Sequence, residues 1–135
     1  MNETKEWEAM KEEANRLSWE IVGAAIEVHR WMGPGLLESV YEECLCRELD
    51  LRNIPYQRQV PFVLEYKGEE LDVGYRLDLV VGGLVIVELK AIQQFEPIHE
   101  AQLLTYLRLR KLWLGLMINF NVPVLKDGIK RMVNG

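Results

Sequence analysis

The sequence predicts an α/β fold, with a small mixed sheet of about four strands flanked by helices. Two segments in the first third of the chain repeat apolar residues at the spacing of amphipathic helices. Three runs rich in β-branched residues follow, and a further helical segment and a final apolar run come after them. The expected order is therefore two helices, three strands, one helix and one strand.

The composition fits one globular domain over residues 1–135. The chain has 49% hydrophobic and 27% charged residues, and a domain typically holds about 100–200 residues. No apolar run approaches the roughly 20 residues of a membrane-spanning helix, and the acidic, polar N-terminus is not that of a secretory signal. Cys44 and Cys46 lie two positions apart in a predicted helix, where side chains do not face each other. We therefore expect free thiols and a reducing, cytoplasmic location.

The first helix is expected over residues 5–32, where apolar residues follow one face. Gly33-Pro34-Gly35 ends it, because glycine and proline both interrupt helices. A second helix is expected over residues 36–50, with Tyr41 and Leu45 in its buried stripe.

Three strands are expected next. Residues 57–66 alternate in polarity, and Pro61 places them at a sheet edge because proline cannot donate to a ladder. Residues 73–81 and 84–91 flank Gly82-Gly83, which is the clearest hairpin signal in the chain.

The last third predicts a helix over residues 97–110, with Pro97 in its first turn. Residues 112–120 are apolar on both faces, as is typical of a central strand. Asp127-Gly128 predicts a turn, and a weak extra strand could follow it.

Charged residues interrupt the apolar hairpin. Glu88 and Lys90 close the run Leu84-Val-Ile-Val87, and they point to the same side because they lie two apart. Asp78 lies in the partner strand between two leucines. Charges at the end of a buried strand are costly unless they are paired or ligated, so these three residues are the candidate site.

The length of the hairpin loop decides whether the two acids meet. With a strict two-residue turn at Gly82-Gly83, Asp78 would lie opposite Val87 and would face away from Glu88. A three-residue loop or a bulge restores one face, and glycine makes such a loop easy to form. The site therefore predicts an irregular hairpin.

If these three side chains lie close together, they could bind a metal ion and act on a phosphate. Two carboxylates hold a hard cation such as Mg²⁺ or Mn²⁺ through oxygen. The ion acidifies a bound water, and Lys90 can orient that water or stabilise charge that develops on a phosphate. The spacing of the three residues is equally consistent with a partly buried salt-bridge cluster that binds no metal.

The string Gly35-Leu-Leu-Glu-Ser-Val-Tyr41 resembles the signature of the GxxExxY proteins, which are assigned to the PD-(D/E)XK nuclease-like superfamily. This resemblance implies a restriction-endonuclease-like core of order α-β-β-β-α-β, and it covers residues 15–132 approximately. It continues through Tyr75-Arg-Leu-Asp78, Val87-Glu-Leu-Lys90-Ala91, His99-Glu-Ala-Gln102-Leu-Leu-Thr-Tyr106-Leu and Gly115-Leu-Met-Ile-Asn119-Phe120.

The resemblance implies a role for each matching residue. Asp78 matches the acid of the second core strand, and Glu88 and Lys90 match the E-x-K of the third. Both acids would be metal ligands, and Lys90 would be catalytic. Leu77 precedes Asp78 where the superfamily name has proline.

Three further positions follow from the same resemblance. The main-chain carbonyl of Leu89 would be another metal ligand. Glu38 matches a helical acid that some members add to the metal site. Gln102 matches a polar residue of the following helix that packs at the site. From the residues alone, Glu38 is also explained by the helix dipole at the start of its helix.

The charge pattern leaves the partner open. A net charge of -5 argues against non-specific nucleic-acid binding by the whole surface. Basic residues could still contact a nucleic-acid backbone locally, and the candidates are Arg76, Arg108, Arg110 and Lys111. The resemblance implies a Mg²⁺-dependent nuclease that acts on DNA, and a homodimer would suit duplex cleavage. The alternatives are a nuclease-fold module that binds nucleic acid or a protein partner without cutting, and a structural dimer formed by the first helix.

Overall fold

The computed structural model describes residues 2–135 and forms, within them, three α-helices and five strands. The helices are α1 (Asn2–Met32), α2 (Glu38–Leu51) and α3 (Pro97–Arg110). The strands are β1 (Tyr56–Tyr66), β2 (Glu69–Val81), β3 (Val85–Lys90), β4 (Leu114–Asn119) and β5 (Ile129–Val133), and a 3₁₀ turn, η1 (Leu125–Gly128), precedes β5.

The five strands form one mixed sheet in the order β1-β2-β3-β4-β5. Strands β3 and β4 are parallel and are joined by α3, whereas the other neighbours are antiparallel. The sheet has one strand more than the expected four, because the weak final segment does pair with β4, from Leu114 to Ile118. Its apolar Ile129 and Met132 pack on the core, while Lys130 and Arg131 stay exposed, as suits an edge strand.

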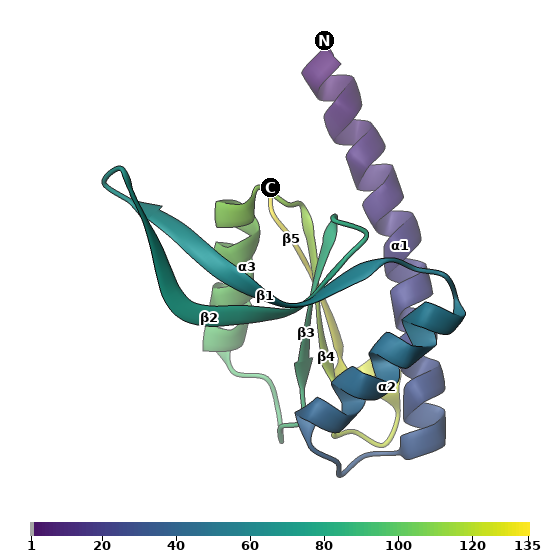
Figure 1. The fold of residues 1–135 in the computed structure, drawn as a ribbon. Coiled ribbons are helices and arrows are strands. Elements are labelled where there is room, and N and C mark those ends of the chain that lie inside the picture. The colour runs from purple at the N-terminus through teal and green to yellow at the C-terminus, as the bar shows by residue number, and fades with distance from the viewer. Residues whose placement is uncertain (1) are drawn as a thin grey trace.

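Helices cover both faces of the sheet (Figure 1). α1 and α2 pack on one face through buried residues such as Ile21 and Leu45, against Val87 of β3. α3 packs on the other face, where Leu103 and Leu107 lie in a second cluster. None of the helices within residues 2–135 has the length and apolarity needed to cross a bilayer. The cysteines are free, as predicted.

Tyr41 connects the two helices of the first face. Its ring stacks on Phe120 with centroids 4.4 Å apart. Its hydroxyl donates to the carbonyl of Gly33 at 2.6 Å and accepts from the N–H of Leu36 at 3.2 Å. Tyr41 therefore connects the turn between α1 and α2 to the core. This connection fixes the position over the sheet at which α2 begins.

The β2–β3 hairpin has the irregular loop that a convergent site requires. Val81 pairs with Val85, so Gly82, Gly83 and Leu84 form a three-residue loop. Both glycines have positive φ, at 59° and 70°. Continuing this register places Asp78 opposite Glu88, which confirms the predicted loop.

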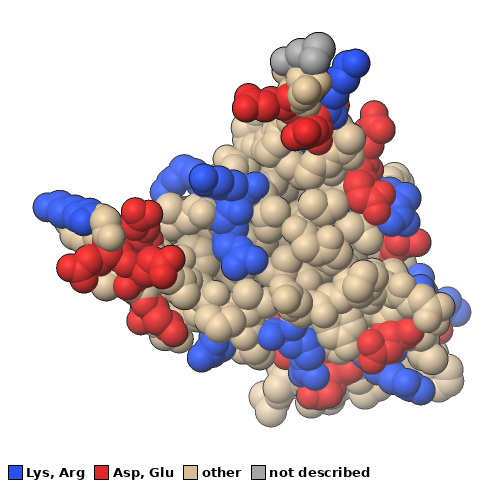
Figure 2. Space-filling view, turned by 45° about the horizontal axis from the view of Figure 1, so that its top comes forward, with Lys and Arg blue, Asp and Glu red and all other residues tan. Residues whose placement is uncertain are grey.

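The outer halves of β1 and β2 leave the body of the molecule as a two-stranded ribbon (Figure 1). β2 begins four residues earlier than expected, at Glu69, because its polar start pairs with β1 outside the core. Figure 2 shows acidic side chains gathered on this ribbon. Its exposed acids are Glu65, Glu69, Glu70 and Asp72.

Candidate active site

Asp78 and Glu88 meet where β2 and β3 separate. The backbone ladder between these strands ends at Leu79 and Val87. One position further, the N–H of Asp78 donates to Oε2 of Glu88 at 2.9 Å, and the N–H of Leu89 donates to Oδ2 of Asp78 at 2.8 Å. The two carboxylates thus replace ladder hydrogen bonds at the fork of the strands, and each is oriented by the opposite strand.

Glu88 is held on its other side by an aromatic group. Only 4% of Glu88 is exposed, and the hydroxyl of Tyr75 donates to its Oε1 in a short hydrogen bond. The Tyr75 ring stacks on Tyr106 of α3, with centroids 4.8 Å apart, and Tyr106 contacts Phe62 at 5.0 Å. Both oxygens of Glu88 therefore have a donor, and its rotamer is tightly constrained.

The electrostatics of the pair follow from burial. Burial raises the pKa of Glu88 to about 7, and the neighbouring charge of Asp78 adds to this effect. Burial also raises the pKa of Asp78, and the charge of Glu42 contributes. Lys90 and the backbone N–H donors oppose both shifts. Two carboxylates in such a place favour a proton or a cation between them.

Lys90 lies at the end of β3, two residues after Glu88. It pairs with Asn119 of β4, and its carbonyl accepts from the N–H of Phe120 at 2.9 Å. Asn119 is 2% exposed and makes hydrogen bonds to both the N–H and the carbonyl of Ile92. Within the described residues the Lys90 ammonium forms no ion pair, so it is free to act on a bound group.

The other predicted site residues are less closely gathered. Glu38 is exposed in the first turn of α2, and its charge acts weakly on Asp78. Gln102 is exposed on α3. Across residues 2–135, no group of three or more His, Cys, Asp or Glu side chains is close enough to hold a metal ion. Asp78 and Glu88 are therefore a two-carboxylate site in this structure.

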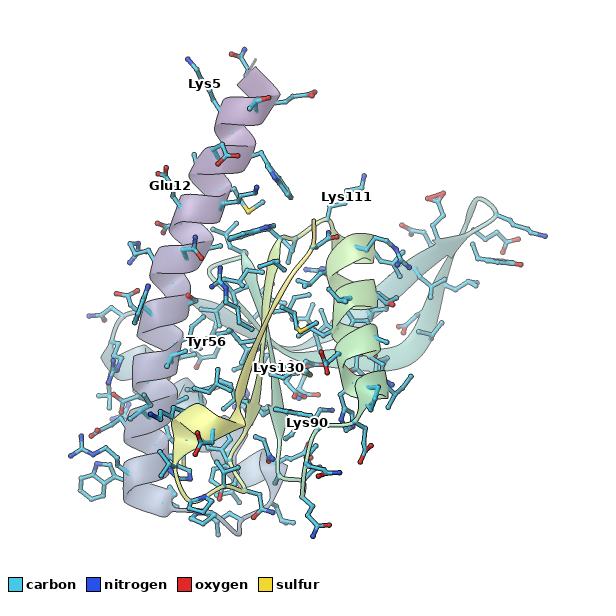
Figure 3. All side chains as sticks on the ribbon, turned by 180° about the vertical axis from the view of Figure 1, so that it is seen from behind. Lys5, Glu12, Tyr56, Lys90, Lys111 and Lys130 are labelled. Carbon is cyan, nitrogen blue, oxygen red and sulfur yellow. The ribbon has the colours of Figure 1, made fainter. Side chains whose placement is uncertain are left out.

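Three of the four predicted basic contacts lie away from the acids. α3 starts after β3 and runs back to the start of β4, so Arg108, Arg110 and Lys111 lie at the opposite end of the sheet from Lys90. Figure 3 shows Lys90 and Lys111 at the two ends of α3. Arg76 is exposed on β2, two residues before Asp78, and is the one that stays near the acids.

Sequence reasoning missed two residues of the site. Tyr75 belongs to the string that ends at Asp78, but only the structure reveals its bond to Glu88. Glu42, one helical turn after Glu38, is 8% exposed and is bound by Arg58 and Gln59. The sequence carries no signal for the burial of Glu42, because this residue lies mostly outside the apolar stripe that was expected for its helix.

One of the comparisons with known proteins identifies a family. A family model described as the PD-(D/E)XK nuclease superfamily matches residues 15–132. No curated protein and no solved structure matches the chain. From α2 to β4 the order is α-β-β-β-α-β, the restriction-endonuclease-like core that the resemblance implies. Because the match spans most of the chain, the chain belongs to the PD-(D/E)XK nuclease superfamily.

Proposed function

We propose that this protein is a metal-dependent nuclease of the GxxExxY group that hydrolyses phosphodiester bonds in DNA. Membership of a nuclease superfamily supports phosphodiester hydrolysis and a nucleic-acid substrate. The observation that carries the proposal is the pairing of Asp78 with Glu88 at the strand fork, with Lys90 two residues further along β3. A salt-bridge cluster would not explain this arrangement, because neither acid is in an ion pair with Lys90 within the described residues.

The donor set fits a divalent cation. Members of this superfamily generally use divalent metal ions. Asp78 and Glu88, with the Leu89 carbonyl, would hold Mg²⁺ or Mn²⁺. Mg²⁺ commonly keeps several waters and binds one or two carboxylates plus substrate phosphates, so a third acidic side chain is not required. When bound, the ion would acidify a water and neutralise charge on the phosphate.

The remaining chemistry belongs to side chains near the acids. The Lys90 ammonium would orient the attacking water and stabilise the charge that develops on the phosphate oxygens. Arg76 would contact the nucleic-acid backbone. Glu38 of α2 and Gln102 of α3 would assist from the flanking helices. The acidic ribbon repels phosphates, so the substrate would approach from the side of Arg76 and Lys90.

A cleavage assay tests the proposal. Labelled single-stranded, duplex and branched DNA and the matching RNAs are incubated with Mg²⁺ or Mn²⁺. Wild type is compared with Glu88→Ala and Lys90→Ala, and with two exposed controls, Glu69→Ala and Lys126→Ala. We expect cutting by wild type and both controls, and loss of cutting in the two site variants with their fold intact.

The same assay decides between a nuclease and a binding module. A folded wild-type protein that cuts no substrate, with no rise in melting temperature on adding Mn²⁺, contradicts the nuclease proposal. Cutting by Lys90→Ala at the wild-type rate contradicts the role of Lys90. Cleavage of RNA alone contradicts the assignment of DNA as substrate.

A further inference from the structure

Gln59 has a strained backbone in the middle of a strand. Its φ is 48°, a region that glycine tolerates and other residues seldom adopt. The other non-glycine residues with positive φ, namely Asn53, Lys67 and Lys111, lie in turns or at a helix end. Strained residues persist where surrounding contacts enforce them, and they cluster at functional sites.

The strain lies opposite Asp78. β1 pairs Arg58 with Leu79 and Val60 with Leu77, so the intervening position of Gln59 matches Asp78. Asp78 turns its N–H toward β3, where it donates to Glu88. In an antiparallel ladder, a residue that bonds one neighbour faces the other as a closely spaced pair without ladder hydrogen bonds. An extended residue at position 59 would therefore place its side chain directly beside that of Asp78.

The Gln59 side chain extends toward α2 instead of lying beside Asp78. Its amide Nε2 donates to Oε1 of Glu42 on α2 at 2.8 Å. Arg58 donates to Oε2 of the same carboxylate from Nε at 3.1 Å and from Nη2 at 2.9 Å. Glu42 is 8% exposed. Two consecutive residues of β1, Arg58 and Gln59, thus donate hydrogen bonds to the two oxygens of this buried carboxylate.

We propose that Gln59 is a positioning residue for Asp78. Its left-handed backbone and its hydrogen bond to Glu42 withdraw its side chain from the place beside Asp78, which leaves that carboxylate free to accept the Leu89 N–H and to reach a bound group. The inference rests on the proposed nuclease function. The strain at Gln59 is then maintained by Glu42 and serves the geometry of the acid pair.

Two variants separate the side chain from the backbone. Gln59→Val favours an extended backbone because valine is β-branched, so it returns a side chain to the place beside Asp78. Gln59→Gly keeps the left-handed backbone and has no side chain to withdraw, so it should leave Asp78 in place. Gln57→Val is the matched control, because Gln57 is exposed on the same strand and has a regular partner in Val80. If Gln59→Val fails to fold, Gln59→Thr, which is also β-branched, decides the outcome.

The first readout is amide hydrogen exchange at Leu89, whose N–H reports directly on the position of Asp78. We expect protection at Leu89 to fall about tenfold in Gln59→Val and to stay unchanged in Gln59→Gly and Gln57→Val. The second readout is cleavage, where kcat should fall about tenfold at constant KM in Gln59→Val alone, since positioning affects the chemical step.

The outcomes separate the two proposals. If wild type cuts nothing but Leu89 protection depends on Gln59, the positioning role stands and the nuclease proposal fails. If wild type cuts and Gln59→Val keeps both kcat and Leu89 protection, or if Gln59→Gly loses them as much as Gln59→Val does, the positioning role is overturned. A loss of global stability with unchanged kcat of the folded protein assigns Gln59 a purely structural role, and this also overturns the inference.

Discussion

Glu88 accepts the backbone N–H of Asp78, and Asp78 accepts the N–H of the residue that follows Glu88. Each acid is thus oriented by the strand that carries the other one. The arrangement explains how two carboxylates stay together at a fork where the ladder has ended. It also means that a change in either acid alters the backbone contacts of both strands, and this leads to the predictions below.

Glu88→Gln should stabilise the metal-free protein at pH 8 and leave it nearly unchanged at pH 4. Burial raises the pKa of Glu88 from 4.5 to about 7, so the folded state binds a proton that the unfolded state has released between these values. The stabilisation from Glu88 is complete below pH 4.5 and is lost as the pH rises through 7. At 1.36 kcal/mol per pKa unit, the gain at pH 8 is up to about 3 kcal/mol.

Chemical denaturation of wild type and Glu88→Gln in EDTA at both pH values measures this difference. The exposed ribbon residue supplies the control variant Glu69→Gln. Unfolding free energies that change in parallel for wild type and Glu88→Gln would refute the assigned protonation of Glu88.

Tyr75→Phe should weaken the hold on Glu88 without disturbing the aromatic stack. It removes a hydrogen bond to a buried acid, and we expect a loss of about 1–2 kcal/mol in the free energy of unfolding. Since that bond lowers the pKa of Glu88, its removal should raise the pKa further. Melting temperatures with and without Mn²⁺ across a pH series should show metal stabilisation beginning at higher pH. Tyr66→Phe, on the exposed ribbon, should match wild type; an identical pH series for Tyr75→Phe would disprove the role.

Asn119→Ala should destabilise the loop that follows Lys90. Asn119 is 2% exposed, accepts from Ile92 and Asn121 at 3.0 and 3.1 Å, and donates to the Ile92 carbonyl at 2.9 Å. Leaving buried backbone groups unpaired costs about 1–3 kcal/mol each, and we expect a total of about 3 kcal/mol. Equilibrium urea unfolding measures it. Asn121→Ala, at an exposed position, should cost under about 1 kcal/mol, and equal losses in the two variants would contradict the assignment.

Two glycine substitutions should have opposite effects on stability. A Cβ at Gly128 would clash with the backbone oxygen of Asn119, so Gly128→Ala should cost at least about 2 kcal/mol. Gly23 lies inside α1, and its new Cβ would approach only the flexible end of Arg52 at 3.2 Å. Gly23→Ala should therefore stabilise by about 0.5–1 kcal/mol. Thermal unfolding of both variants tests the pair, and a stable Gly128→Ala would show that η1 can shift away from β4.

The helices and the acid pair could be predicted because both depend on local patterns. The apolar face of residues 5–32 and the Gly82-Gly83 signal each specify a local structure. The three-residue β2–β3 loop was predicted only on the condition that Asp78 and Glu88 share one face, because the sequence alone also allowed a two-residue turn. β5 was underestimated because its exposed Lys130 and Arg131 mask a half-buried edge strand.

The parts that the sequence did not reveal depend on long-range packing. Arg108, Arg110 and Lys111 cluster in sequence, but the crossover of α3 carries them to the far end of the sheet. The positive φ of Gln59 has no sequence signal, and the side chain of this residue bonds Glu42, which lies on another element and 17 positions away in the chain. Likewise, Tyr75 resembles an ordinary strand residue until Glu88 is placed beside it.

The three-residue loop Gly82-Gly83-Leu84 separates loop length from strand register. Deleting Gly83 would leave Gly82 and Leu84 as a two-residue turn, and Val81 would still pair with Val85, so Asp78 would remain opposite Glu88. At the present length, by contrast, a two-residue turn at Gly82-Gly83 would pair Val81 with Leu84 and would place the two acids on opposite sides of the sheet. The acid pair therefore tolerates a shorter loop, whereas a one-residue slip in register separates the acids without altering either of them.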